Sequence, residues 1–339
     1  MKKILYIHII ASLVMIMSTG FIYAKIMTDT DLDGLSDTEE INTYITNPHN
    51  QDTDLDDFPD AMEIYYGYSP LKGNAAELEK ISLDLPYIHE SPDGSWTGPW
   101  KNGCEEASIF MIENFYIGKN DPSIKESMNF MMALFNKQDQ IWGSNADSDA
   151  YRTNKLINDF TKYNSTIIDN PTIEQIKIEL QQKRPVIALH YGKTLANPNI
   201  PFAANGSYYH MTVIIGYDEP NQEFIVHDNG DPKTGDAHRY KYSVFMESLH
   251  DFDFATRKAD GPARVIFTYP KLVKLMTSPK VYFLQNKTKQ WIINEQVFNT
   301  NAWDWDAINI VRPEWLINFT NGLNIIEDLK DKKRPITSM

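Results

Sequence analysis

The single cysteine of this 339-residue chain, Cys104, lies where a thiol could act as a nucleophile. It follows the turn-rich stretch 90–103 and begins segment 104–116, whose apolar residues recur at helical spacing. The free amides and the dipole of a helix N-terminus favour an anion, so we expect a lowered pKa for this thiol. The Cys104 amide could also donate to an oxyanion. The alternative is an inert thiol in the core.

Among the eight histidines, His210 is the best placed to act as a base for that thiol. It begins the apolar run 210–218, which predicts a buried strand, and segment 224–230 predicts the returning strand of a hairpin. The start of the first strand then lies near the end of the second. We therefore expect Asp228 to orient His210, as in a catalytic triad. Asn229 in that role, and His210 as a core histidine, are the alternatives.

Two acidic loops have the spacing of calcium sites. In each, carboxylates occupy positions 1, 3, 5, 9 and 12 of a twelve-residue loop, and the second loop follows the first by 23 residues. The expected calcium ligands are Asp29, Asp31, Asp33, Asp37 and Glu40 in the first loop and Asp52, Asp54, Asp56, Asp60 and Glu63 in the second. Gly34 permits the sharp turn of the first loop, whereas Asp57 replaces it in the second. An acidic disordered linker is the alternative.

Acidity is concentrated in this part of the chain. Residues 29–63 contain twelve Asp or Glu residues and no Lys or Arg, which accounts for most of the net charge of −14. The remainder has no basic patch, so we expect no nucleic-acid partner. Structural Ca²⁺ is the expected cofactor, because the carboxylates would otherwise repel one another. We expect the segment to form a calcium-stiffened spacer ahead of the next domain.

Two resemblances follow from these motifs. Residues 28–72 resemble thrombospondin type 3 and related bacterial calcium repeats. Residues from 81 to about 268 resemble secreted bacterial papain-like peptidases of the bacteriocin-processing type, family thirty-nine of the cysteine peptidases. Leu-Pro-Tyr at 85–87, Gly-Cys-Glu-Glu-Ala-Ser at 103–108 and His-Met-Thr-Val-Ile-Ile-Gly-Tyr-Asp at 210–218 carry the second resemblance. It implies an α+β fold with the cysteine helix packed against an antiparallel sheet, and it implies the triad Cys104, His210 and Asp228.

The sequence departs from this family at Glu90. The family usually has a glutamine there, which donates a hydrogen bond to the oxyanion. A carboxylate accepts hydrogen bonds and repels an oxyanion. Either Glu90 is protonated, or another donor serves, or activity is impaired.

The N-terminus has the features of a cleaved signal peptide. Lys2 and Lys3 precede an apolar run at 4–17, and Ala24 provides the small residue for cleavage. We therefore expect export, a location outside the cell or in the cell envelope, and no membrane span in the mature protein. An uncleaved anchor is the alternative.

Composition divides the chain into four segments. They are a signal peptide (1–24), the calcium repeats (28–72), the peptidase domain (81–270) and a small C-terminal α/β module (274–325). The last segment resembles a short module of some bacterial surface proteins, and its aromatic residues suit either a core or glycan binding.

The predicted function is that of an exported cysteine peptidase acting on a peptide or protein. A cell-wall amidase or acyl transferase, with cell-envelope partners, would use the same triad. A calcium-dependent surface binding or adhesion protein with a degenerate site is the non-enzymatic alternative, and Glu90 favours it.

Overall fold

The computed structural model describes most of the chain beyond its N-terminal segment. The described residues are 28–56, 58–73, 78–200, 202, 208–275, 278–311 and 313–327. The predicted signal peptide, residues 1–24, lies outside them, as does Asp57. Within these ranges, no helix combines the length and the apolar composition that crossing a bilayer requires.

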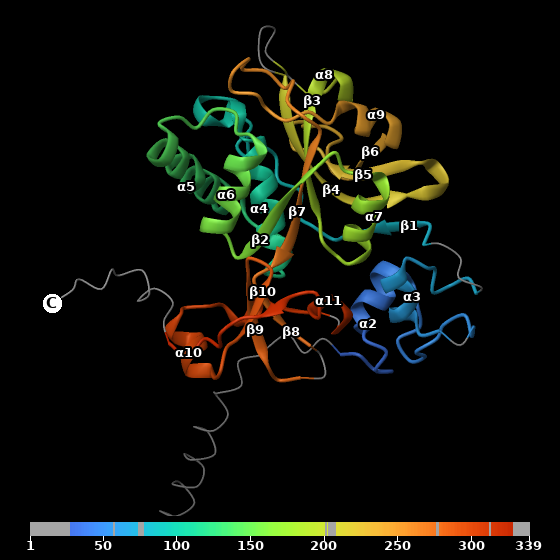
Figure 1. The fold of residues 1–339 in the computed structure, drawn as a ribbon. Coiled ribbons are helices and arrows are strands. Elements are labelled where there is room, and N and C mark those ends of the chain that lie inside the picture. Colours follow the sequence, from blue (N-terminus) through green and yellow to red (C-terminus); the bar gives the residue numbers. More distant parts are fainter. Residues whose placement is uncertain are drawn as a thin grey trace, which may run out of the picture.

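A seven-stranded antiparallel sheet forms the centre of the larger folded part (Figure 1). The strand order is β2-β7-β3-β4-β5-β6, and β1 pairs with the C-terminal end of β4. The strands are β1 (Lys80–Ser82), β2 (Tyr163–Asp169), β3 (Val186–Tyr191), β4 (Tyr209–Asp218), β5 (Glu223–His227), β6 (His238–Lys241) and β7 (Arg264–Pro270). The sheet is therefore built from strands far apart in the sequence, with β4 near its middle.

Helices lie on both sides of this sheet. In Figure 1, α4, α5 and α6 lie to the left of β4 and β7, and α7 and α9 lie to the right. These helices and the short α8 are α4 (Cys104–Tyr116), α5 (Ile124–Trp142), α6 (Ala150–Phe160), α7 (Ile173–Gln181), α8 (Gly192–Leu195) and α9 (Tyr242–Ser248). Every residue of β4 is buried, because α4 and α7 both contact it. The predicted α+β fold, with the cysteine helix on an antiparallel sheet, is confirmed.

The helix boundaries follow from local capping chemistry. The side chains of Ser123, Asp149 and Thr172 accept hydrogen bonds from the first turns of α5, α6 and α7. Gly143 ends α5 in the left-handed conformation, with φ of 72°. The start of α4, by contrast, has no side-chain cap.

The acidic repeats form α2 (Asp37–Glu39), the π-helical turn η1 (Glu40–Tyr44) and α3 (Asp60–Tyr66). Leu35 and Ile64 are buried in the same apolar core as Ile81 of the central sheet. Glu39 also forms an ion pair with Lys183, just after α7. The predicted spacer role is therefore wrong, because the repeats pack against the larger domain.

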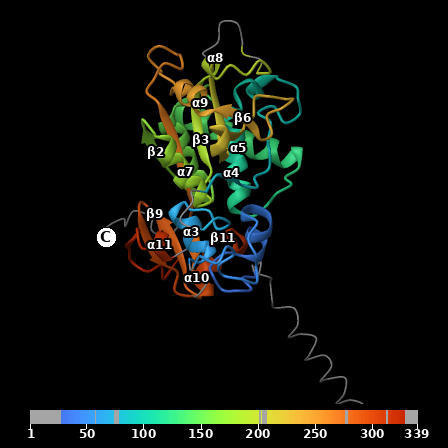
Figure 2. The same cartoon turned by 90° about the vertical axis from the view of Figure 1, so that its right-hand side faces the viewer.

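The C-terminal part is a second, five-stranded sheet in the order β11-β8-β9-β10-β12. Its elements are β8 (Leu272–Lys274), β9 (Val281–Gln285), β10 (Thr288–Trp291), α10 (Glu295–Thr300), η4 (Trp305–Ala307), β11 (Ile308–Ile310), α11 (Pro313–Leu316) and β12 (Thr320–Asn321). Trp305 stacks on Phe298 and Trp303 on Phe283. These aromatic rings pack into the module's own core. Figure 2 shows this sheet beside the acidic repeats, below the central domain.

Candidate active site

Cys104 is the first residue of α4 and is only 4% exposed. It follows the 3₁₀ turn η2 (Gly98–Asn102), and Gly103 joins the two. A Cβ on Gly103 would lie 2.3 Å from the Glu90 carbonyl oxygen, so only glycine allows this close approach. The start of the helix is thus held against the segment that carries Glu90.

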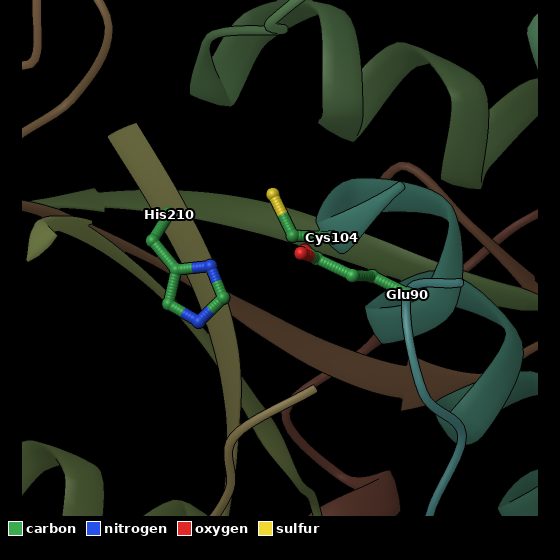
Figure 3. A group of neighbouring side chains, drawn as sticks. All are labelled: Glu90, Cys104 and His210. Atoms are coloured by element: carbon green, nitrogen blue, oxygen red, sulfur yellow. The ribbon is translucent and has the colours of Figure 1, made fainter. Parts of the chain in front are cut away.

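His210 meets Asp228 because of the register of β4 and β5. Val213 faces His227 at the end of β5, so His210 lies beyond that end, where Asp228 follows. His210 Nε2 lies 2.8 Å from Asp228 Oδ1. Since an ionised carboxylate only accepts hydrogen bonds, Nε2 carries the proton. The other ring nitrogen then lies on the side of Cys104 (Figure 3).

Asn229 would have to bond to His210 if it were the orienting residue, but its amide bonds to α4 instead. Its amide donates to the Cys104 carbonyl oxygen and to Ser108 Oγ, both at 2.9 Å. It therefore ties the turn after β5 to the first turns of α4. Asp228, not Asn229, is the residue that contacts the imidazole.

Glu90 completes a buried group of three side chains (Figure 3). A Glu90 oxygen, the Cys104 sulfur and a His210 ring nitrogen all lie within 4.8 Å of one another. The Glu90 amide donates to the Asn229 carbonyl at 3.0 Å, which fixes its backbone. Burial raises the pKa of Glu90 to about 7, although His210 opposes the shift. The Glu90 carboxyl group therefore lies beside both the thiol and the imidazole.

The electrostatics around Cys104 differ from the prediction. Burial raises the pKa of the Cys104 thiol well above its usual value, and the Glu105 and Glu90 carboxylates raise it further. The thiol donates to Glu105 Oε2 at 3.1 Å, which also favours the protonated form. The expected lowering of this pKa is therefore wrong for this arrangement, because burial, and after it the two nearby carboxyl groups, favours the protonated thiol.

Asp228 stabilises the protonated form of His210, and His210 stabilises the ionised form of Asp228. Burial alone would lower the pKa of His210, but Asp228, Glu90 and Glu105 raise it overall. Burial would raise the pKa of Asp228, whereas His210 and the hydrogen bonds from Tyr240 and Asn197 lower it. The imidazole can accept the thiol proton through its second nitrogen once the thiol turns away from Glu105.

Some supporting residues could not be recognised from the sequence. Tyr240 and Asn197 donate to Asp228 Oδ2, and a Cβ on Gly230 would lie 2.8 Å from His210 Cε1. Glu105 accepts both the thiol hydrogen bond and the Ser148 amide. Of these residues, only Glu105 could have been singled out from the sequence. It is an acidic residue that directly follows the cysteine, in a helix that packs through apolar residues.

The two acidic loops have matching backbone geometry. Asp37 accepts from the amide and hydroxyl of Thr30, and Asp60 accepts from the same groups of Thr53. The leucines at position 4 of the loops both have φ near 65°. Asp37 and Asp60 thus brace their loops, with both carboxylate oxygens in use.

Three of the remaining predicted ligands in each loop bring their oxygens together. Asp29, Asp31 and Asp33 bring oxygens within 4.8 Å of one another, as do Asp52, Asp54 and Asp56. Among the described residues, buried carboxylate oxygens of Asp31, Glu40, Asp54 and Glu63 have no hydrogen-bond partner. Burial and nearby carboxylates raise the pKa of Glu40 to about 7 and of Glu63 to about 8. Such oxygens fit a hard divalent cation such as Ca²⁺.

Comparison with known proteins places the chain in a family. Residues 82–255, just over half of the chain, match the Peptidase_C39 like family, and the chain belongs to it. One matching solved structure, described as a C39-like peptidase from Bacillus anthracis, covers 57% of this chain and 98% of its own, at 16% identity and a TM-score of 0.37. No curated protein matches the chain. The family assignment confirms the predicted peptidase class.

Proposed function

We propose that this chain is an exported cysteine peptidase with Cys104 as nucleophile, His210 as base and Asp228 as the residue that orients His210. One observation carries the proposal. The imidazole is bonded through one nitrogen to Asp228 and faces, with the other, the chain's single thiol at the start of a helix. In the reaction, His210 takes the thiol proton, the thiolate attacks the scissile carbonyl, and His210 returns the proton to the leaving amine.

The acidic repeats are proposed to bind structural Ca²⁺. The unpartnered buried oxygens of Glu40 and Glu63 support this role, because leaving them without a cation is costly. Asp29, Asp31 and Asp33 would join Glu40 in the first site. The corresponding second site would use Glu63 with Asp52, Asp54 and Asp56, while Asp37 and Asp60 hold the loops.

Export is proposed from the N-terminal sequence. The basic residues, apolar run and small residue at 24 support delivery outside the cell or to the cell envelope. Substrates would then be extracellular peptides or proteins, with cell-envelope components as further partners.

Labelling of Cys104 by iodoacetamide tests the catalytic proposal. A small reagent suits a thiol that is only 4% exposed, and the label has one cysteine to modify. We expect labelling of the wild type to be at least tenfold faster than that of His210→Ala, because the base is lost. His238→Ala, on β6, is the control, and Cys104→Ser gives the background. Hydrolysis of a peptide library that disappears in Cys104→Ser completes the test.

A surface binding protein with an inactive site is the second candidate. The carboxyl groups of Glu90 and Glu105, which disfavour the thiolate, are the observation behind it. It predicts equally slow labelling of the wild type and His210→Ala, together with no peptide hydrolysis. That result would remove the peptidase proposal. Cleavage of cell-wall amides without cleavage of peptide substrates would favour an amidase instead.

A further inference from the structure

We propose that Glu90, Cys104 and His210 form a binding site for Zn²⁺ at the catalytic centre. Thiolate, imidazole and carboxylate are the three ligand types that zinc prefers in proteins. One donor atom from each lies within 4.8 Å of the other two, and all three residues are buried. Proteolytic chemistry requires no such metal, so the site is additional to the proposed function.

The distances suit a single ion after a small adjustment. Zinc–ligand bonds of 2.0 to 2.3 Å at tetrahedral angles place the ligand atoms about 3.5 Å apart. The donor atoms lie within 4.8 Å of one another, and rotation of the Cys104 and Glu90 side chains can close the remaining gap. His210 is already oriented, because its Nε2–H donates to Asp228 at 2.8 Å. A carboxylate on the far nitrogen is the usual support for a zinc-bound histidine.

Glu90 is the residue that distinguishes this group from a simple thiol–imidazole pair. It is 6% exposed, and no hydrogen bond to its carboxylate is found among the described residues. Burial disfavours the ionised form of this carboxyl group, and a cation beside it would offset that cost. The buried Asp228 carboxylate, which accepts the hydrogen bond from His210 Nε2, adds to the negative potential. Three protein ligands leave one tetrahedral position for water.

Zinc at this position would block the thiol. The ion would hold Cys104 as a bound thiolate and occupy the His210 nitrogen that must accept the proton. Zn²⁺ would therefore inhibit peptide hydrolysis reversibly, and only this inhibition rests on the proposed peptidase function. Binding itself does not depend on it.

Protection of Cys104 against iodoacetamide measures the binding of Zn²⁺ directly. The purified chain is incubated with Zn²⁺ in excess Ca²⁺, which saturates the acidic loops, and is then labelled with iodoacetamide. We expect Zn²⁺ to slow labelling of the wild type, with a half-protecting concentration at least tenfold lower than for Glu90→Gln. Glu113→Gln is the matched control, because Glu113 is as buried as Glu90, at 6% exposed, but lies on α4 nine residues after Cys104. It should behave as the wild type.

A spectroscopic measurement on the wild type keeps the test independent of variant folding. Co²⁺ in place of Zn²⁺ should produce an intense thiolate-to-metal charge-transfer band, because the only sulfur ligand available from cysteine is Cys104. Absence of that band, or equal protection of wild type and Glu90→Gln, would overturn the proposal. An increase in peptide hydrolysis on adding Zn²⁺ would overturn the inhibitory role. If Cys104 is labelled fast in a way that depends on His210, but Zn²⁺ does not slow the labelling, the zinc site is contradicted and the peptidase proposal stands.

Discussion

Replacement of Glu90 by glutamine should change how the stability of the protein depends on pH. Burial raises the pKa of Glu90 from 4.5 to about 7 in the folded state. Between these values the unfolded chain releases a proton that the folded chain retains. The free energy of unfolding therefore falls as pH rises from about 4.5 to 7. Each pH unit contributes about 1.4 kcal/mol, so the total is about 3 kcal/mol.

Glu90→Gln has no proton to release and removes this contribution. We expect the variant and the wild type to be similarly stable near pH 4.5, and the variant to be about 3 kcal/mol more stable at pH 8. Urea unfolding followed by tryptophan fluorescence, in saturating Ca²⁺, measures the difference at each pH. Glu247→Gln, at an exposed position of α9, is the control and should show no such trend.

The test is how the difference in unfolding free energy between Glu90→Gln and the wild type varies with pH. A constant offset between Glu90→Gln and the wild type from pH 4.5 to 8 would refute the reasoning, since the folded state would then retain no more protons on Glu90 than the unfolded chain does. In that case, the carboxylate would face the reaction centre as an anion above its ordinary pKa. The same variant also puts a side-chain amide, which can donate to an oxyanion, in place of the carboxylate, so peptide hydrolysis at pH 8 should rise by at least tenfold.

Three further outcomes are expected. Gly230→Ala places a methyl group 2.8 Å from His210 Cε1, so it should slow iodoacetamide labelling of Cys104 at least tenfold; an unchanged rate would contradict the placement of the ring. Tyr240→Phe removes a donor from buried Asp228, so the free energy of unfolding should fall by about 1.5–3 kcal/mol in urea titrations, and a loss below about 0.5 kcal/mol would count against this contact. Removal of Ca²⁺ with a chelator should lower the melting temperature and expose residues 28–72 to a protease of broad specificity. The loss is about 3 kcal/mol per site if Ca²⁺ was at 100 times its Kd, and an unchanged digestion pattern would argue against calcium.

The sequence alone was sufficient for features that depend on local spacing. The helix from Cys104 to Tyr116 begins and ends where the periodicity predicted. The hairpin that brings His210 near Asp228 follows from two apolar runs and a short turn. The calcium-type spacing of the acidic loops is likewise a property of adjacent residues. Covalent geometry relates such positions directly, so a pattern along the chain predicts which side chains share a face.

Interactions between distant segments could not be predicted in this way. Tyr240 and Asn197 reach Asp228 from β6 and from the segment after α8, and no local pattern marks them as partners. The sequence also left Asn229 open as an alternative, and packing of its amide against Ser108 of α4 excludes it from contact with His210. These choices depend on how β4, β5 and α4 pack together.

The strongest contrast concerns Cys104 itself. Its single occurrence, the preceding glycine and the following helix were sufficient to select it as the candidate nucleophile from the sequence. The state of its thiol was decided by tertiary structure, because burial and the carboxyl groups of Glu90 and Glu105 raise its pKa. Residue type and spacing determine which groups are available for chemistry. Desolvation and charge through space determine their protonation, and both depend on which segments the fold brings together.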